Sequence, residues 1–387
     1  MHLCMSGLDY SVASIALREQ LSFTKNGVLD MDRIIAANPQ LLGVVLLSTC
    51  NRTELYLSCA DGPDLDPGEL LCRAAGADYQ DFANAFVTRR DTECVRHLME
   101  VACGLRSQIL GEDQILTQVK TAVTLAREAG TSDSVLETLF RTAAACGKAA
   151  KTGGRLTGLP TSAAHQAVAA LEERMGSLAG KRAMVIGNGE MGRLAASLLR
   201  DAGCAVTVTL RSYRHGETVV PAGCAVASYD DRYAAMENMD LLISATTSPH
   251  YTVMAEPFTA VVNPPKLLVD LAIPRDIQPD LGEAADGVVL LNVDDLSQKT
   301  GADAKELARV HSTIQEYMDR FYQWNNYRES LPVLEEVKTA VLDRVRDMDT
   351  EDAVCKTIEL LVGGVKDGFT PETLAACAAK IRAHTRT

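Results

Sequence analysis

Cys50 stands in a sequence context that could support covalent catalysis. It closely follows the apolar run 41–47, and the polar residues Asn-Arg-Thr-Glu at 51–54 come directly after it. A partly exposed thiol with a cation two residues away, here Arg52, is expected to have a lowered pKa, and the thiolate is the form that attacks an electrophilic carbon. We therefore predict that Cys50, among the eleven cysteines, is a nucleophile.

A second group of polar side chains interrupts an otherwise apolar stretch. Its members are Ser107, Glu112, Gln114 and Gln118. Two interpretations stay open at this point. The side chains line a polar pocket, or Glu112 and Gln114 cap the helix that follows them.

His97 is a third candidate for chemistry, since an imidazole can take up or release a proton near neutral pH. It lies on a helix predicted over 93–101. A single histidine on a helix is more often a partly exposed surface residue than a catalyst, so its value depends on what it faces.

A glycine-rich turn follows the strand predicted over 182–186 and opens a helix over 191–202. In this context the spacing Gly-x-Gly-x-x-Gly predicts a dinucleotide site, because the glycines let the backbone approach a pyrophosphate at a helix N-terminus. The residues assigned to the cofactor in this turn are Gly187, Asn188, Gly189, Glu190, Met191 and Gly192.

The end of the next strand indicates which dinucleotide is bound. An NAD enzyme carries a carboxylate there, whereas this chain has Arg211 and Ser212. A guanidinium and a hydroxyl suit a 2′-phosphate, so NADPH is favoured over NADH. Thr246 follows a later strand at the same edge of the sheet and is expected to line the cofactor site.

The hydrophobic patterns that position these residues divide the chain into three parts. Residues 1–155 mix short strands with helices, an α+β pattern, and residues 156–296 alternate strands and helices, an α/β pattern with a Rossmann-type parallel sheet. Residues 297–387 are helical, with a long helix predicted over 303–324, an interruption at Pro332 and two further helices. Helices without a sheet to cover are expected to pack against a second subunit.

Composition limits the class of protein. A net charge of −13 argues against binding nucleic acid through the whole surface, although a local basic patch remains compatible with it. The sequence contains no apolar run of about 20 residues and no secretory leader, so a cytoplasmic protein without a membrane association is expected. The irregularly spaced cysteines predict neither a disulfide framework nor a metal site.

The motifs together resemble those of the glutamyl-tRNA reductase family. In order, the chain contains STCNRTE at 48–54, VRHL at 95–98, GEDQILTQVK at 111–120, the glycine turn, and VDLAIPRDI at 269–277. The first and third motifs are highly specific to that family. The resemblance is close to about residue 300 and looser beyond it.

The resemblance implies an N-terminal catalytic domain, a central NADPH domain, and a long spinal helix leading to a helical dimerisation domain. It implies reduction of glutamyl-tRNA(Glu) to glutamate-1-semialdehyde through a thioester, the first step of tetrapyrrole synthesis by the five-carbon route. The expected partners are the charged tRNA, a second copy of the chain, and glutamate-1-semialdehyde aminomutase, which uses the aldehyde.

The resemblance also implies roles for individual residues. Cys50 would be the nucleophile and His97 would assist proton transfer. The side chains expected to hold or line the glutamyl group are Thr49, Asn51, Arg52, Ser107, Glu112, Gln114 and Gln118.

Two departures from the family pattern lie near these residues. Asp-Tyr-Ser-Val-Ala at 9–13 replaces an Asn-His-Lys-Thr-Ala-like turn, and Arg106 replaces an aspartate. They leave open a non-catalytic paralogue that binds tRNA or a partner and regulates the pathway. A small hydroxy-acid NADP dehydrogenase is a further alternative, which explains the glycine turn but not the cysteine motif.

Overall fold

The computed structural model describes residues 2–60, 65–112, 114–154, 162–211, 219–285, 287–296 and 304–364, together with residues 375 and 378. Contacts between residues divide the chain into two compact units, Met1–Phe321 and Tyr322–Thr387. Two sheets lie in the first unit. Among the described residues, no helix is both long and apolar enough to cross a bilayer.

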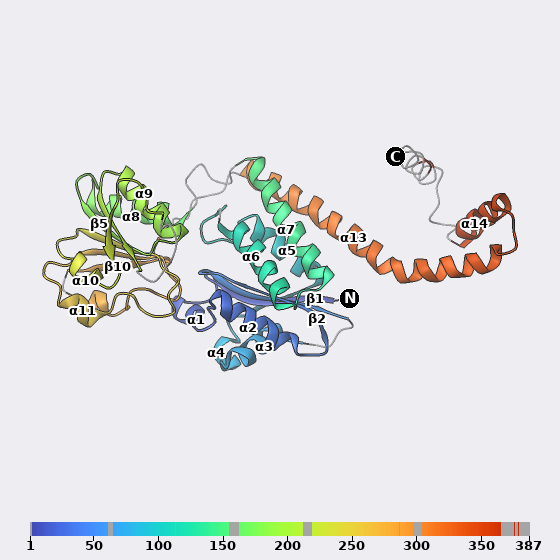
Figure 1. The fold of residues 1–387 in the computed structure, drawn as a ribbon, viewed down its shortest axis with the longest axis horizontal. Helices are drawn as coiled ribbons and strands as arrows, with labels where there is room; N and C mark the ends of the chain where they lie inside the picture. Colours follow the sequence, from blue (N-terminus) through green and yellow to red (C-terminus); the bar gives the residue numbers. More distant parts are fainter. Residues whose placement is uncertain are drawn as a thin grey trace. The chain divides into compact units, whose positions relative to one another are not determined.

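The N-terminal sheet is antiparallel and sandwiched between helices (Figure 1). Helices α2 and α3 pack on one face, α5 and α7 on the other, and α6 packs along the edge strand β2. In sheet order the strands are β2 (Leu41–Ser48), β3 (Arg52–Cys59), β1 (His2–Asp9) and β4 (Val87–Arg90). The helices are α1 (Ile15–Gln20), α2 (Lys25–Ala36), α3 (Pro67–Ala75), α4 (Tyr79–Phe82), α5 (Asp91–Ala102), α6 (Gln114–Ala129) and α7 (Ser134–Thr152).

The central strand β3 is buried along its whole length, since helices cover both faces of the sheet. Side chains alternate between the faces, so Leu55 and Leu57 enter the core shared with α2 and α3. The intervening residues point to the other face, where Tyr56 packs edge-on against Phe140 of α7, with ring centres 5.1 Å apart. The polar side chains of Arg52 and Glu54 share that buried face.

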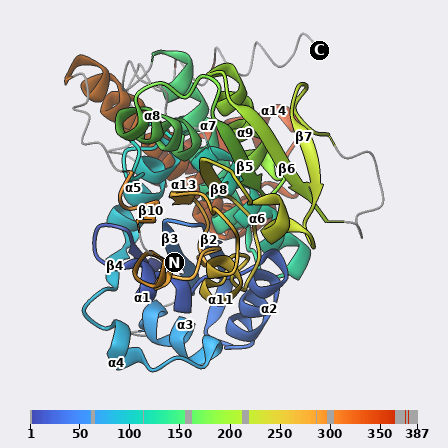
Figure 2. The same cartoon turned by 90° about the vertical axis from the view of Figure 1, so that its left-hand side faces the viewer.

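The second sheet is parallel, and its strand order is β7-β6-β5-β8-β9-β10. Figure 2 shows β8, β5, β6 and β7 as neighbours. The strands are β5 (Arg182–Ile186), β6 (Ala205–Leu210), β7 (Ala225–Ser228), β8 (Leu241–Ser244), β9 (Leu267–Asp270) and β10 (Val289–Asn292). Helices α8 (Ala163–Met175) and α9 (Glu190–Asp201) cover one face, and the short helices α10 (Arg232–Ala235), α11 (Ala255–Thr259) and α12 (Leu281–Ala284) lie on the other side.

This order confirms the predicted Rossmann-type architecture. The chain direction across the sheet reverses between β5 and β8, and in such sheets ligands bind at that switch point, beyond the carboxyl ends of the strands. The glycine turn follows β5 and Thr246 follows β8, so both lie at the switch point.

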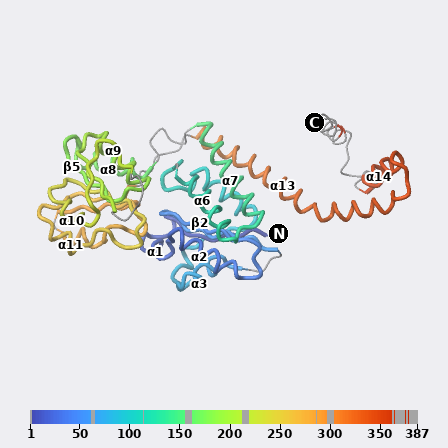
Figure 3. The backbone as a smooth tube through the Cα atoms, viewed as in Figure 1, coloured from blue at the N-terminus to red at the C-terminus, as the bar shows by residue number. Residues whose placement is uncertain are grey.

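The predicted interruption at Pro332 is wrong. One 42-residue helix, α13 (Ala304–Val345), passes through Pro332, and α14 (Thr350–Gly364) follows. Proline removes one backbone hydrogen bond, and the neighbouring residues 329–336 are exposed, so water can satisfy the freed carbonyl. Figure 3 traces the beginning of α13 beside the end of α7, where Arg309 donates to the carbonyl of Ala150 at 2.7 Å.

Asp32 of α2 provides a test of the N-terminal packing. Its carboxylate is fully buried and accepts a hydrogen bond from the Leu46 amide of edge strand β2 at 3.0 Å. Burial raises the pKa of Asp32 to about 8. Because the folded pKa lies above the unfolded one, the stability that Asp32 contributes is complete below pH ~4 and is lost as the pH rises through ~8.

We predict that Asp32→Asn flattens this pH dependence. Between pH 5 and pH 8 the unfolding midpoint in urea should fall less in the variant than in the wild type. Asp30→Asn is the matched control, since Asp30 is exposed on the same helix. Parallel pH profiles for wild type and Asp32→Asn would show that the buried carboxyl does not titrate in this range.

Candidate active site

A tight turn between β2 and β3 presents Cys50. The Thr49 hydroxyl accepts hydrogen bonds from the backbone amides of Asn51 and Arg52, both at 3.1 Å, and the Thr49 amide donates to the Arg52 carbonyl at 2.8 Å. Cys50 is half-buried at the tip of this turn. Thr49, expected to bind substrate, is thus also the residue that shapes the turn.

Arg18 of α1 holds the turn in place through hydrogen bonds, and the sequence did not indicate this residue. Its guanidinium is 2% exposed and donates through Nη1 to the Cys50 carbonyl at 3.1 Å and to the Asn51 amide oxygen at 3.2 Å. The Asn51 side chain therefore has a partner within the protein. An arginine in a short helix far from any motif carries no sequence signal of such a role.

Arg52 belongs to a buried polar network on the sheet face under α5. Its Nη1 donates to Glu54 Oε1 at 2.8 Å, and its Nη2 donates to the Arg106 carbonyl. Glu54 also meets His97 Nε2 at 2.8 Å and accepts from the Tyr56 hydroxyl at 2.7 Å. Burial alone would raise the pKa of Glu54, but His97 and Arg52 hold that pKa well below its usual range.

His97 is more deeply placed than its sequence suggests. The side chain is 3% exposed, and its Nδ1 has no hydrogen-bond partner among the described residues. It lines a cavity of about 220 Å³ together with Glu54, Tyr10 and Arg106. Both departures from the family pattern, the segment 9–12 and Arg106, thus face the same cavity as the catalytic candidate His97.

The segment around Ser107 approaches the cysteine turn. Ser107 and Glu112 are buried, the Tyr10 hydroxyl donates to the Ser107 carbonyl at 3.3 Å, and the Ser107 hydroxyl has no partner among the described residues. Gln114 begins α6 and Gln118 lies one turn later, both half-buried. Residue 113 lies outside the described part, so the capping interpretation of Glu112 and Gln114 stays open.

The predicted lowering of the Cys50 pKa is wrong for this state of the protein. Burial raises the pKa of Cys50 to about 12, and the Glu112 carboxylate adds to the rise, while Arg18 and Arg52 oppose it. Arg52 contributes least among these causes, and its guanidinium is paired with Glu54 at 2.8 Å and lies 3.9 Å from the Asp9 carboxylate. At neutral pH the thiol is therefore protonated.

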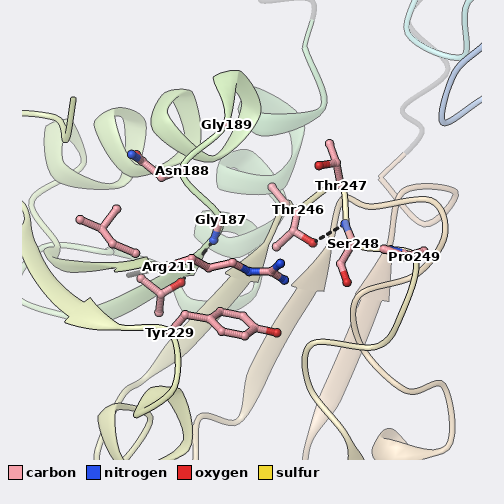
Figure 4. Close-up of a pocket in the computed structure, with 12 residues that line it drawn as sticks. Gly187, Asn188, Gly189, Arg211, Tyr229, Thr246, Thr247, Ser248 and Pro249 are labelled. Atoms are coloured by element: carbon pink, nitrogen blue, oxygen red, sulfur yellow. Dashed lines mark hydrogen bonds between the residues drawn. The ribbon is translucent and has the colours of Figure 1, made fainter. Parts of the chain in front are cut away.

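The nucleotide pocket lies at the switch point of the parallel sheet and has a volume of about 200 Å³. Figure 4 shows the turn from Gly187 to Gly189 at the start of α9, opposite the loop from Thr246 to Pro249. Among the predicted cofactor residues, those that line it are Gly187, Asn188, Gly189, Arg211 and Thr246. Thr209 and Tyr229, which the sequence did not indicate, also line it, as do Ser248 and Pro249 of the loop that carries Thr246.

The remaining residues of the glycine motif act around the pocket rather than lining it. Glu190 is exposed in the first turn of α9, and Met191 packs against the core. A Cβ at Gly192 would collide with the Gly187 carbonyl oxygen, so a glycine is required there for the turn to fold back on the helix. Ser212 lies outside the described residues.

Arg211 contributes a positive charge to the lining of this pocket. Arg211 extends from the end of β6 over the Tyr229 ring, with its guanidinium carbon 4.4 Å from the ring centre, and reaches toward Thr246 and Ser248 (Figure 4). Among the described residues that line the pocket, none is acidic. The backbone N–H groups at the start of α9 and this guanidinium together suit the phosphate groups of a nucleotide.

Asp276 anchors the loop that carries Thr246. Its carboxylate accepts from the Thr246 amide at 2.7 Å and from the Ser244 hydroxyl at 2.7 Å. Burial raises the pKa of Asp276, and these hydrogen bonds oppose the rise. The described residues include no cluster of three His, Cys, Asp or Glu side chains that could hold a metal ion.

Two protein-family models match the chain, and each covers the region that contains one of the two sheets. The family model for the glutamyl-tRNA(Glu) reductase N-terminal domain matches residues 6–153. The model for shikimate / quinate 5-dehydrogenase matches residues 169–299.

Similar proteins extend over both regions. Glutamyl-tRNA reductase of Acetivibrio thermocellus is 41% identical over 333 residues, covering 86% of this chain and 99% of that protein. The glutamyl-tRNA reductase of Alkaliphilus oremlandii is 38% identical over 337 residues, covering 86% and 99%. The solved structure of glutamyl-tRNA reductase from Methanopyrus kandleri aligns with 94% of this chain and 90% of that one, at 29% identity and a TM-score of 0.48.

The raised Cys50 pKa predicts slow alkylation at neutral pH. The rate at which iodoacetamide modifies Cys50 should climb with pH without levelling off below pH 10, since the pKa lies near 12. Glu112→Gln should increase the rate at every pH, because it removes a charge that opposes the thiolate. Mass spectrometry of the Cys50 peptide separates this signal from the exposed Cys355. A rate that levels off near pH 7 would contradict the raised pKa.

Proposed function

The chain belongs to the glutamyl-tRNA reductase family, and from this premise we propose that it reduces glutamyl-tRNA(Glu) to glutamate-1-semialdehyde with NADPH and releases the tRNA. This reaction is the first step of tetrapyrrole biosynthesis by the five-carbon route. The observation that best supports the proposal is the fixed, half-buried turn that presents Cys50, in the same compact unit as a pyridine-nucleotide pocket.

In the first half-reaction the Cys50 sulfur attacks the ester carbonyl carbon of the glutamyl group. A carbon–sulfur bond forms, the carbon–oxygen bond to the tRNA breaks, and the proton lost by the thiol ends on the tRNA 3′-terminal oxygen. The thioester that remains keeps the carbonyl reactive. Arg18 holds the backbone of the attacking residue in place through the Cys50 carbonyl.

Substrate binding itself relieves the high pKa of Cys50. The ammonium group of the glutamyl ester is a cation, and we assign the Glu112 carboxylate as its partner. Pairing neutralises the charge that raises the pKa of Cys50, and the ammonium also attracts the thiolate directly. Binding of the ester therefore lowers the pKa of Cys50, although burial, the largest cause of the raised pKa, remains.

The residues of the second pocket hold the reductant. Gly187 to Gly189 and the start of α9 suit the pyrophosphate, and Arg211 suits the 2′-phosphate. The hydride for the thioester carbon would come from bound NADPH, which would become NADP⁺. The Cys50 sulfur would then leave as the carbon–sulfur bond breaks, and it would take a proton from solvent while the aldehyde is released.

The C-terminal helices suit a homodimer. On α14 the exposed residues Val354, Ile358 and Leu361 recur at helical spacing, and Val333 and Leu334 are exposed on α13. We propose that a second copy of the chain covers these side chains.

We also propose that the protein works in the cytoplasm, where its described cysteines stay as free thiols. Glutamate-1-semialdehyde aminomutase is the proposed partner that takes the aldehyde.

The covalent scheme predicts two linked losses in Cys50→Ala. The wild type should produce aldehyde with NADPH and should slowly deacylate glutamyl-tRNA without NADPH, because water can attack the thioester. Cys50→Ala should lose both activities, whereas Cys224→Ala, a half-buried cysteine of the parallel-sheet region, should keep both. Tight tRNA binding by the wild type with neither reaction would support the regulatory paralogue instead.

The cofactor assignment predicts a selective loss in Arg211→Ala. A charge-assisted hydrogen bond contributes about 1.5–3 kcal/mol, so the KM for NADPH should rise about 10- to 100-fold. The KM for NADH, which lacks the 2′-phosphate, should change little. Steady-state kinetics with both nucleotides measures the ratio, and equal changes for the two would rule out recognition of the 2′-phosphate by Arg211.

A further inference from the structure

Two neighbouring charged residues on α1 each bind the region that carries the parallel sheet. Arg18 Nη2 lies 2.7 Å from both carboxylate oxygens of Asp294, just after β10. Glu19 accepts from Arg275 through both oxygens, Nε at 2.9 Å and Nη2 at 2.7 Å, and from the Arg275 amide at 2.6 Å. A six-residue helix of the N-terminal layer thus carries two ion pairs to residues more than 250 positions away.

The Arg18 pair leads to the nucleophile. The same guanidinium that binds Asp294 donates to the Cys50 carbonyl and to Asn51. Gln108, next to Ser107 in the segment that approaches the cysteine turn, also donates to Asp294 Oδ1 and to the Val293 carbonyl, both at 3.2 Å. Asp294 is therefore a common partner for the two segments that surround Cys50.

The Glu19 pair leads to the nucleotide pocket. Arg275 is followed directly by Asp276, whose carboxylate holds the amide of Thr246, a residue that lines the pocket. A continuous set of contacts therefore runs from the Cys50 turn through Arg18 and Glu19 to the loop that borders the nucleotide.

The two ion pairs restrict both the rotation and the separation of the two sheet regions. Arg275 binds the two oxygens of Glu19 through two nitrogens, a geometry that fixes the orientation of the two groups as well as their distance, whereas Arg18 reaches both oxygens of Asp294 through Nη2 alone. The two ion pairs come from adjacent residues and end at separate points of the partner surface, so together they resist twisting of one sheet region against the other. Arg18 is almost fully buried and Glu19 and Arg275 are mostly buried, so water screens these pairs less than it screens surface ion pairs.

We propose that α1 is a positioning element for hydride transfer, in which Arg18–Asp294 and Glu19–Arg275 hold the nucleotide pocket in register with Cys50. This inference rests on the proposed function. Acyl transfer to Cys50 uses side chains of the N-terminal sheet and the helices that cover it. Reduction of the thioester also needs the nucleotide pocket to be aligned with Cys50. The two reactions therefore respond differently when the ion pairs are broken.

The test compares the two reactions in the full-length protein. Asp294→Asn and Glu19→Gln should lower the kcat of NADPH-dependent aldehyde formation about 10- to 100-fold, since small misplacements of reacting groups have effects of that size. In Glu19→Gln, deacylation of glutamyl-tRNA without NADPH and the KM for NADPH should stay within about twofold of the wild type, a change of at most ~0.4 kcal/mol. Asp294→Asn should lower deacylation as well, because Asp294 pairs with the Arg18 that holds the Cys50 carbonyl. Asp295→Asn is the matched control, because Asp295 is the exposed neighbour of Asp294 in the same turn.

A charge exchange provides the second measurement. Glu19→Arg alone should lose reduction, and the double variant Glu19→Arg with Arg275→Glu should recover it, because the ion pair is restored in reverse. Equal loss of deacylation and reduction in Glu19→Gln, or no loss of either, would overturn the proposal, as would an exchange variant that folds but does not recover. If the wild type forms no aldehyde at all, the proposed function itself fails, which is a different outcome.

Discussion

The buried carboxylate of Glu54 is the constraint on which the N-terminal layer depends. An ion in the middle of a covered sheet costs several kcal/mol in lost hydration unless cations and donors surround it. Arg52 and Tyr56 of the same strand and His97 of α5 surround the Glu54 carboxylate in this way. Once they do, the start of β3 can take only one arrangement, and the turn before it places Cys50.

This constraint explains why residues expected to contact substrate also have structural partners. Arg52, Asn51 and Thr49 are engaged by Glu54, Arg18 and the turn backbone respectively. The cysteine turn is organised before any ligand arrives, and such preorganisation lowers the cost of reaching the reacting geometry. Their roles in holding the glutamyl group remain predictions.

The sequence predicted the parallel sheet well because its signals are local. Apolar runs such as 182–186 and the glycine turn after them depend only on neighbouring residues, and the structure confirms both. Arg18 could not be predicted, since its partner Asp294 is 276 residues away. The prediction of a lowered Cys50 pKa failed for a related reason: the nearby cation Arg52 was visible in the sequence, but the burial of the thiol and the approach of Glu112 from a distant segment were not. The rule that proline interrupts a helix gave the wrong prediction at Pro332, because the helix is exposed there and water can bond to the freed carbonyl.

The protonated state of Cys50 has a consequence for the resting enzyme. Peroxides and other cellular oxidants attack thiolates far faster than thiols, and over-oxidation of a cysteine beyond the sulfenic acid is largely irreversible. Under the proposed function, a nucleophile whose pKa falls when the charged ester binds would be exposed to such damage mainly during turnover. The burial that raises the Cys50 pKa would thus also protect the thiol between turnovers.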